Sequence, residues 1–251
     1  MKIPIVRTCV IGALALLAVA GWTQASAATA GPSLTGEKLA ALLRAARTVI
    51  SGHQALINDA SIGDKGLSGE RIAGETIALY AQRVGSKPLD GDLSAREDKL
   101  LRAQLAAITE VVDEHQVDIN KKGVGLKGFI PAVFARLVNE RYLEKVGDLA
   151  RIKVTAPLHL VRNRRARPDD WERDAIETIL SSTEWTKGKT YSQELTFEGR
   201  PALRMLLPEY YSKSCLTCHG GPKGDLDITG YPKEGGKEND LAGAISIVIF
   251  E

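Results

Sequence analysis

The chain has 251 residues, of which 44% are hydrophobic and 25% charged. That composition is typical of a globular protein and excludes a disordered or collagen-like chain. The formal net charge is +2, and without Lys2 and Arg7 the chain has 31 basic and 31 acidic residues, so bulk charge gives no ground for binding nucleic acid or an acidic membrane.

The N-terminal segment 1–27 has the three-part layout of a secretory signal peptide. Basic residues precede an apolar run from Cys9 to Ala20, and small residues follow as far as Ala27. We expect cleavage after Ala27; a retained anchor is the weaker alternative, because the apolar run is short for a bilayer. The mature chain, 28–251, is then expected to be a single periplasmic domain without a membrane span.

Four amphipathic helices are predicted next, because apolar residues recur in steps of three and four. The third helix is expected to begin at a capping box formed by Ser94 and Glu97. Its apolar stripe contains His115, and the apolar stripe of the first helix contains His53. HQALIN follows the same pattern as HQVDIN, but six residues are too few to establish a duplication. The helices are expected over residues 37–57, 70–84, 95–119 and 132–146.

The second half changes character at about residue 150. Alternating, β-branched segments predict strands over 151–157, 189–197, 201–210 and 242–250, and Pro168 with Asp169 predicts a helix as far as Ser181. Helices followed by strands predict an α+β fold, with a helical part over about 35–146 and an antiparallel sheet over about 150–251.

The segment SCLTCHGG lies between the last two predicted strands and contains Cys215, Cys218 and His219. A disulfide between these cysteines would close almost no loop and contribute little stability. A thioredoxin-like dithiol needs a helix after the motif, and the glycines and prolines that follow break helices. Adjacent Cys218 and His219 are awkwardly placed to share one tetrahedral zinc ion with Cys215.

Covalent haem attachment uses all three residues. In a CxxCH motif the two thiols bond to the porphyrin vinyl groups, and the following histidine is the proximal iron ligand. We therefore predict one covalent c-type haem on Cys215 and Cys218, with His219 as the iron ligand.

Four blocks of the chain carry a resemblance to known proteins: AARTVISGHQALIND, GVGLKGFIPAVFARLV, TAPLHLVRNRRARPDDWE and LLPEYYSKSCLTCHGGPKGDLDITGYPKEGGKENDLAGAISI. They resemble a family of exported single-haem c-type cytochromes and haem sensors of poorly defined function. The resemblance covers most of the mature chain and is most specific around the CxxCH motif. It implies a PAS-like sheet packed on the helical half, with haem between the CxxCH loop and the helices.

The distal iron ligand needs a separate argument. Some related domains are thought to use a cysteine there, and the mature chain has none to spare. Met205 is expected to fill the core, whereas His53 and His115 each need a partner to offset burial on an apolar stripe. We expect His53 to be the distal ligand and His115 to be the alternative, because the first helix matches a block of the resemblance.

Other side chains are candidates for contact with the haem. Phe129 and Phe134 suit haem packing or ordinary core packing equally. Lys223, Lys233 and Arg204 lie near the motif in sequence and could pair with haem propionates, although a solvated charge is the default for each.

The expected function is that of a redox protein that carries or senses one electron and acts with a redox or signalling protein partner. The alternative is a haem-based sensor of nitric oxide, carbon monoxide or oxygen, which PAS-like architecture favours by analogy alone. No acid–base constellation points to an enzyme, and the sequence does not give the oligomeric state.

Overall fold

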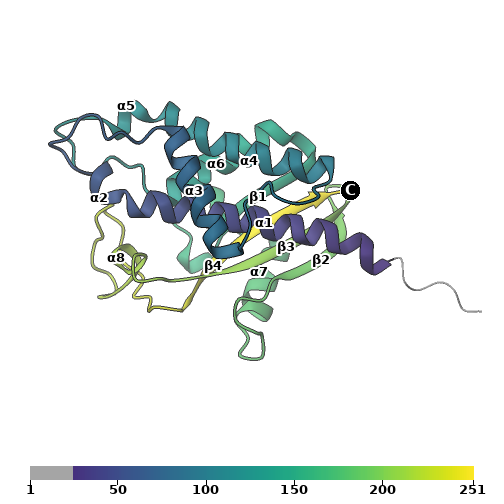
Figure 1. Ribbon diagram of the computed structural model, residues 1–251. Coiled ribbons are helices and arrows are strands. Elements are labelled where there is room, and N and C mark those ends of the chain that lie inside the picture. Colours follow the sequence, from purple (N-terminus) through teal and green to yellow (C-terminus); the bar gives the residue numbers. More distant parts are fainter. Residues whose placement is uncertain (1–24) are drawn as a thin grey trace, which may run out of the picture.

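A computed structural model describes residues 25–251, so the predicted signal peptide, residues 1–27, lies almost entirely outside the described residues. Within this part of the chain, no helix is both long and apolar enough to cross a membrane. Figure 1 shows a helical first half packed against a sheet formed by the second half.

The helical half contains long helices joined in hairpins by loops with short helical turns. Ser68 and Ser94 cap two of the helices with side-chain oxygens that accept backbone N–H bonds. Only half of the predicted capping box forms, because the carboxylate of Glu97 binds Lys38 instead. The helices are α1 (Ala25–Gly52), α2 (Gln54–Ile57), α3 (Gly69–Val84), α4 (Ala95–Glu114), α5 (Gln116–Ile119) and α6 (Pro131–Val146).

Two helices that were predicted to be continuous are interrupted, each at its histidine. His53 separates α1 from α2, and His115 separates α4 from α5. Their backbones have ψ angles near zero, at 1° and 13°, rather than the value of about −42° of a regular helix. Periodicity alone could not reveal these breaks, because the turn of helix that follows keeps the apolar side chains in phase.

The second half forms an antiparallel sheet in the order β1-β4-β3-β2, which confirms the predicted α+β class. An Asp169 capping box starts the predicted helix, which changes to π-helical bonding at Ile176. The elements are η1 (Gly147–Leu149), β1 (Ala150–Thr155), η2 (Leu158–Leu160), η3 (Arg164–Ala166), α7 (Asp170–Ala175), η4 (Ile176–Leu180), β2 (Tyr191–Phe197), β3 (Arg200–Tyr210), α8 (Leu216–His219) and β4 (Leu241–Phe250).

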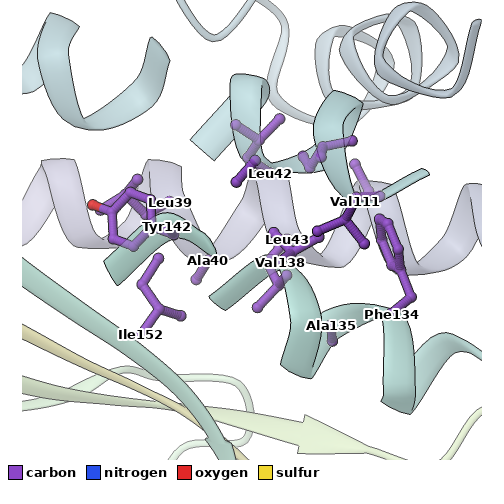
Figure 2. Packing of buried hydrophobic residues seen from close by; sticks show 14 of the residues in the cluster. Leu39, Ala40, Leu42, Leu43, Val111, Phe134, Ala135, Val138, Tyr142 and Ile152 are labelled. Atoms are coloured by element: carbon purple, nitrogen blue, oxygen red, sulfur yellow. The ribbon is translucent and has the colours of Figure 1, made fainter. Parts of the chain in front are cut away.

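One hydrophobic core joins the helices to one face of the sheet. Helices α1 and α6 pack directly on the strands, and α3 and α4 pack on those two helices. Figure 2 shows Leu43 of α1, Val138 of α6 and Ile152 of β1 among the buried side chains of this core. Helix α7 and the π-helical turn after it pack on a second cluster that includes Leu206 of the sheet.

The helical half is an internal duplication with a constant offset of 62 residues. Helices α3 and α6 have 16 residues each, and each ends at a glycine, Gly85 or Gly147. Tyr80 and Tyr142 occupy equivalent buried positions in these helices. The similarity between HQALIN and HQVDIN therefore belongs to a much longer structural repeat, α1–α3 and α4–α6.

The two copies are joined by reciprocal hydrogen bonds. The side-chain amide of Gln54 donates to the carbonyl of Phe129 at 2.9 Å, and that of Gln116 donates to the carbonyl of Leu67 at 2.8 Å. The amide oxygens of Asn58 and Asn120 likewise accept from the backbone N–H of Lys127 and Lys65, respectively. Each loop is thus held by the other copy.

Candidate haem-attachment site

The CxxCH motif lies in the predicted place, between β3 and β4, and forms the single helical turn α8. The backbone N–H groups of Cys218 and His219 both donate to the carbonyl of Cys215, at 3.1 and 2.9 Å. Residues three and four positions apart share one face of a helix, so both sulfurs and the imidazole start from the same face. The two thiols are not joined to each other.

The imidazole of His219 is oriented by two neighbours. Its Nδ1 lies 2.9 Å from a carboxylate oxygen of Glu234, which can only accept, so Nδ1 carries the proton and donates. The ring also stacks on Tyr211, with a centroid distance of 5.2 Å and an interplanar angle of 22°. This tautomer leaves the lone pair of Nε2 available for a metal, as an iron ligand requires.

A second backbone segment holds the carboxylate of Glu234 next to the motif. Gly236 N donates to the carbonyl of His219 at 2.8 Å, and Gly235 N donates to that of Gly220 at 3.1 Å. A Cβ at Gly236 would lie 2.5 Å from the ring of Tyr211, so only glycine fits there. These contacts fix the position of Glu234 relative to His219.

Arg162 links this segment to the rest of the loop. Its guanidinium binds both oxygens of Glu234, at 2.7 and 2.9 Å, and Oδ2 of Asp227 at 2.6 Å. It also donates to the carbonyl of Cys218 at 2.9 Å. Burial alone would raise the pKa of Asp227, but hydrogen bonds from Thr229 and Arg162 outweigh it and hold that pKa well below its usual range.

The thiol chemistry differs from that of a redox dithiol. Burial, together with the nearby carboxylate of Asp227, raises the pKa of the Cys218 thiol. Reactive dithiols need the opposite shift, because the thiolate is the nucleophile. In the part of the chain described here, no cluster of three or more His, Cys, Asp and Glu side chains could hold a bare metal ion.

A family model named Tll0287-like matches residues 91–249, which is more than half of the chain. The chain belongs to the Tll0287-like family. This membership indicates a protein that is cytochrome c-like or haem-related. No curated protein and no solved structure matches the chain.

The two candidate distal histidines of this Tll0287-like chain lie at equivalent points of the duplication but in different surroundings. His53 Nε2 lies 2.6 Å from Oε2 of Glu75 in α3. His115 Nδ1 lies 2.8 Å from the carbonyl of Val111, and its ring lies 5.4 Å from that of Phe129. Each imidazole therefore has a partner within the helical half.

The packing of α1 and α4 distinguishes the two histidines. Arg44 and Arg47 of α1 bind the carboxylate of Glu209 at the end of β3, at 2.6 and 2.5 Å. From there α1 continues to His53 while β3 continues to Tyr211 and the motif, and α2 and α8 lie at the same end of the molecule in Figure 1. Helix α4 packs mainly on other helices, so of the two helices that end at these histidines, α1 is the one anchored at the end of the sheet that carries the motif.

The other candidate residues have varied surroundings. The side chain of Phe129 is buried in the helical core against Phe134, at a centroid distance of 5.8 Å. Lys223 is exposed beside Gly235 at the motif, whereas Arg204 is buried and binds Asp169 at 2.6 Å, where α7 begins. The side chain of Met205 is fully buried in the core beneath Gly36 of α1, which agrees with its expected role as core filler.

Four residues around the imidazole of His219 were not predicted from the sequence, namely Arg162, Tyr211, Asp227 and Glu234. Arg162 and Glu234 are 72 positions apart, and a charged loop side chain is solvated by default. One signal was available, because all four lie in blocks that carry the family resemblance. Arg162 lies in TAPLHLVRNRRARPDDWE, and the other three lie in the long block that contains the CxxCH motif.

Proposed function

We propose that this chain is an exported monohaem c-type cytochrome that carries or senses one electron. Cys215 and Cys218 would hold one haem covalently, and His219 would bind the iron through Nε2. Bound haem would supply a one-electron couple at the iron. The observation that supports this proposal best is the hydrogen bond from His219 Nδ1 to Glu234, which leaves Nε2 for the metal.

The surroundings of the motif suit an apolar macrocycle. Asp227 turns its side chain inward beside Cys218, while its neighbours Leu226 and Ile228 are 69% and 61% exposed. Tyr231, on the same loop, is 48% exposed. Apolar side chains beside the attachment cysteines would cover part of a porphyrin, and a PAS-like arrangement with haem between this loop and the helices is part of the proposal.

Attachment is tested by producing the mature chain in a host that assembles c-type cytochromes. The purified protein should be coloured and heavier than the polypeptide by one haem. The Cys215→Ser/Cys218→Ser double variant should be colourless. A colourless wild-type protein with the mass of the bare polypeptide would contradict the proposal.

On the distal side, we propose His53 as the second iron ligand. Coordination through Nε2 would require this atom to leave Glu75. His53→Ala should then abolish the low-spin bands of the visible spectrum, whereas His115→Ala should leave them unchanged. Low-spin bands that survive in the His53→Ala variant would show that the assignment is wrong.

A haem-based gas sensor is the second candidate, and one specific observation supports it. Both candidate imidazoles already have hydrogen-bond partners, so an iron without a second protein ligand is compatible with this structure. Rapid binding of carbon monoxide to the reduced wild-type protein would favour the sensor. A low-spin spectrum that carbon monoxide does not change would favour the electron carrier.

A further inference from the structure

The carboxylate behind His219 is held more firmly than a surface side chain. The side chain of Glu234 is 15% exposed, and both of its oxygens have donors. Oε2 accepts from His219 Nδ1 and from Arg162, whereas Oε1 accepts from Arg162 alone. The fork of the guanidinium fixes the carboxylate plane and so keeps Oε2 aimed at the imidazole.

The hydrogen bond at Nδ1 matters because it affects the opposite ring nitrogen, Nε2, which would bind the iron. Imidazole transmits charge from one nitrogen to the other, and an ionised carboxylate is a stronger acceptor than a neutral carbonyl. A carboxylate at Nδ1 therefore makes Nε2 a better electron donor. More donation to iron stabilises the ferric state relative to the ferrous state.

We propose that Glu234 is the positioning residue of the proximal iron ligand: it fixes the tautomer and orientation of His219, strengthens its donation to iron and so lowers the reduction potential. Arg162 moderates this effect, because its cation withdraws charge from the same carboxylate. The inference rests on the proposed function, since it requires haem iron at Nε2 of His219.

The test compares midpoint potentials of the haem-loaded wild-type protein and its Glu234→Gln variant. At a fixed ambient potential, the variant should have a ferrous-to-ferric ratio at least about tenfold higher, which is 59 mV for a one-electron couple. Glu238→Gln is the matched control, because it removes the same charge from an exposed side chain of the same loop. Its ratio should change by less than about twofold.

Arg162→Gln provides a check on direction. It leaves the carboxylate with its full charge, so the potential should fall, opposite to Glu234→Gln. A merely structural role would loosen the loop in both variants and shift both potentials in the same direction. Shifts of the same sign, or a Glu234→Gln shift no larger than that of Glu238→Gln, would overturn the inference.

A second measurement, on the wild-type protein, tests the inference even if the Glu234→Gln variant fails to retain haem. In the reduced wild-type protein, which is diamagnetic when the iron has a second protein ligand or bound carbon monoxide, the Nδ1 proton of His219 should exchange slowly with solvent, because the carboxylate holds it. Exchange as fast as that of an exposed imidazole would refute the inference. Mass spectrometry of the wild-type protein separates the two proposals: absence of haem refutes the function, whereas bound haem with unchanged potentials refutes only the role of Glu234.

Discussion

Replacing Arg162 with methionine should destabilise the protein strongly, because it leaves two carboxylates without their cation. The side chain of Asp227 is fully buried and that of Glu234 is 15% exposed, and Arg162 contacts them at 2.6 to 2.9 Å. Removing one partner from a buried ion pair costs about 3–5 kcal/mol. We expect a loss of that size in the free energy of unfolding at pH 7.

The loss should also depend on pH. In the wild-type protein the pKa values of Asp227 and Glu234 are lowered: burial raises both, but hydrogen bonds, including those from Arg162, outweigh it. A lowered folded-state pKa adds stability above the unfolded value, about 4, and that stability is lost as the pH falls through the folded value. Arg162→Met loses this contribution, so its difference from the wild-type protein should be largest near pH 7 and shrink below about pH 4.

Denaturant titrations of the purified proteins at pH 7 and pH 3 measure both effects. Arg165→Met is the matched control, because the side chain of Arg165 is 71% exposed and its one ion pair among the described residues is with Glu140, so it should lose less than about 0.5 kcal/mol. The double variant Arg162→Met/Asp227→Asn removes one stranded charge and should recover part of the loss. If Arg162→Met stays within about 1 kcal/mol of the wild-type protein at pH 7, the cluster does not hold the loop as argued.

Three further predictions concern packing and the duplication, and thermal and denaturant unfolding measure all of them. Asn58→Ala and Asn120→Ala should each lower the free energy of unfolding by about 1–3 kcal/mol, because each leaves a loop N–H of the other copy without its acceptor. The two losses should be similar, and a large difference between them would contradict the equivalence of the copies. Gly236→Ala should lower the free energy of unfolding by about 1–3 kcal/mol, because the new Cβ would clash with Tyr211. Gly74→Ala should instead raise it by about 1 kcal/mol, because Gly74 is an exposed helical residue with no atom within 4 Å of the new Cβ. Tyr80→Phe and Tyr142→Phe should be neutral or stabilising, because both hydroxyls are buried without a partner among the described residues, and a loss above about 1 kcal/mol would refute this.

Local patterns predicted most of the secondary structure because the signals lie within a few residues of each other. The helices that end at Val84 and Val146, the strands and the placement of the CxxCH motif between β3 and β4 all agree with the structure. The breaks at His53 and His115 were missed, since they change the backbone without changing which side chains are apolar.

The duplication was hidden because burial, rather than residue identity, is shared between the copies. Leu42 corresponds to Gln104, and Thr76 to Val138, yet all four side chains are buried. A buried glutamine is acceptable there because its amide donates to the carbonyl of Leu39. Such pairs lower the sequence similarity of the copies without changing their fold.

Only part of the candidate site could be predicted from the sequence. Cys215, Cys218 and His219 lie within five residues, so their spacing alone predicts haem attachment, which stays a prediction, and their place between β3 and β4 agrees with the structure. The bond between Arg162 and Glu234 depends on how the segment after β1 folds back against the loop before β4. No periodicity connects positions that far apart, and only the tertiary structure brings them together.

The residues that the family model matches bear on the choice between His53 and His115 as distal ligand. The match, residues 91–249, contains the second copy of the duplication and all of the sheet except Phe250, but not α1. Yet α1 packs on β3 and β4 and shares their core, so the folding unit extends beyond the matched residues. His115 is inside the match and His53 outside it, whereas the ion pairs to Glu209 anchor the helix of His53 at the motif end of the sheet. The comparison of His53→Ala with His115→Ala therefore decides whether the helix that packs on β3 and β4 or the copy within the matched residues supplies the ligand, and the packing of α1 on these strands favours His53.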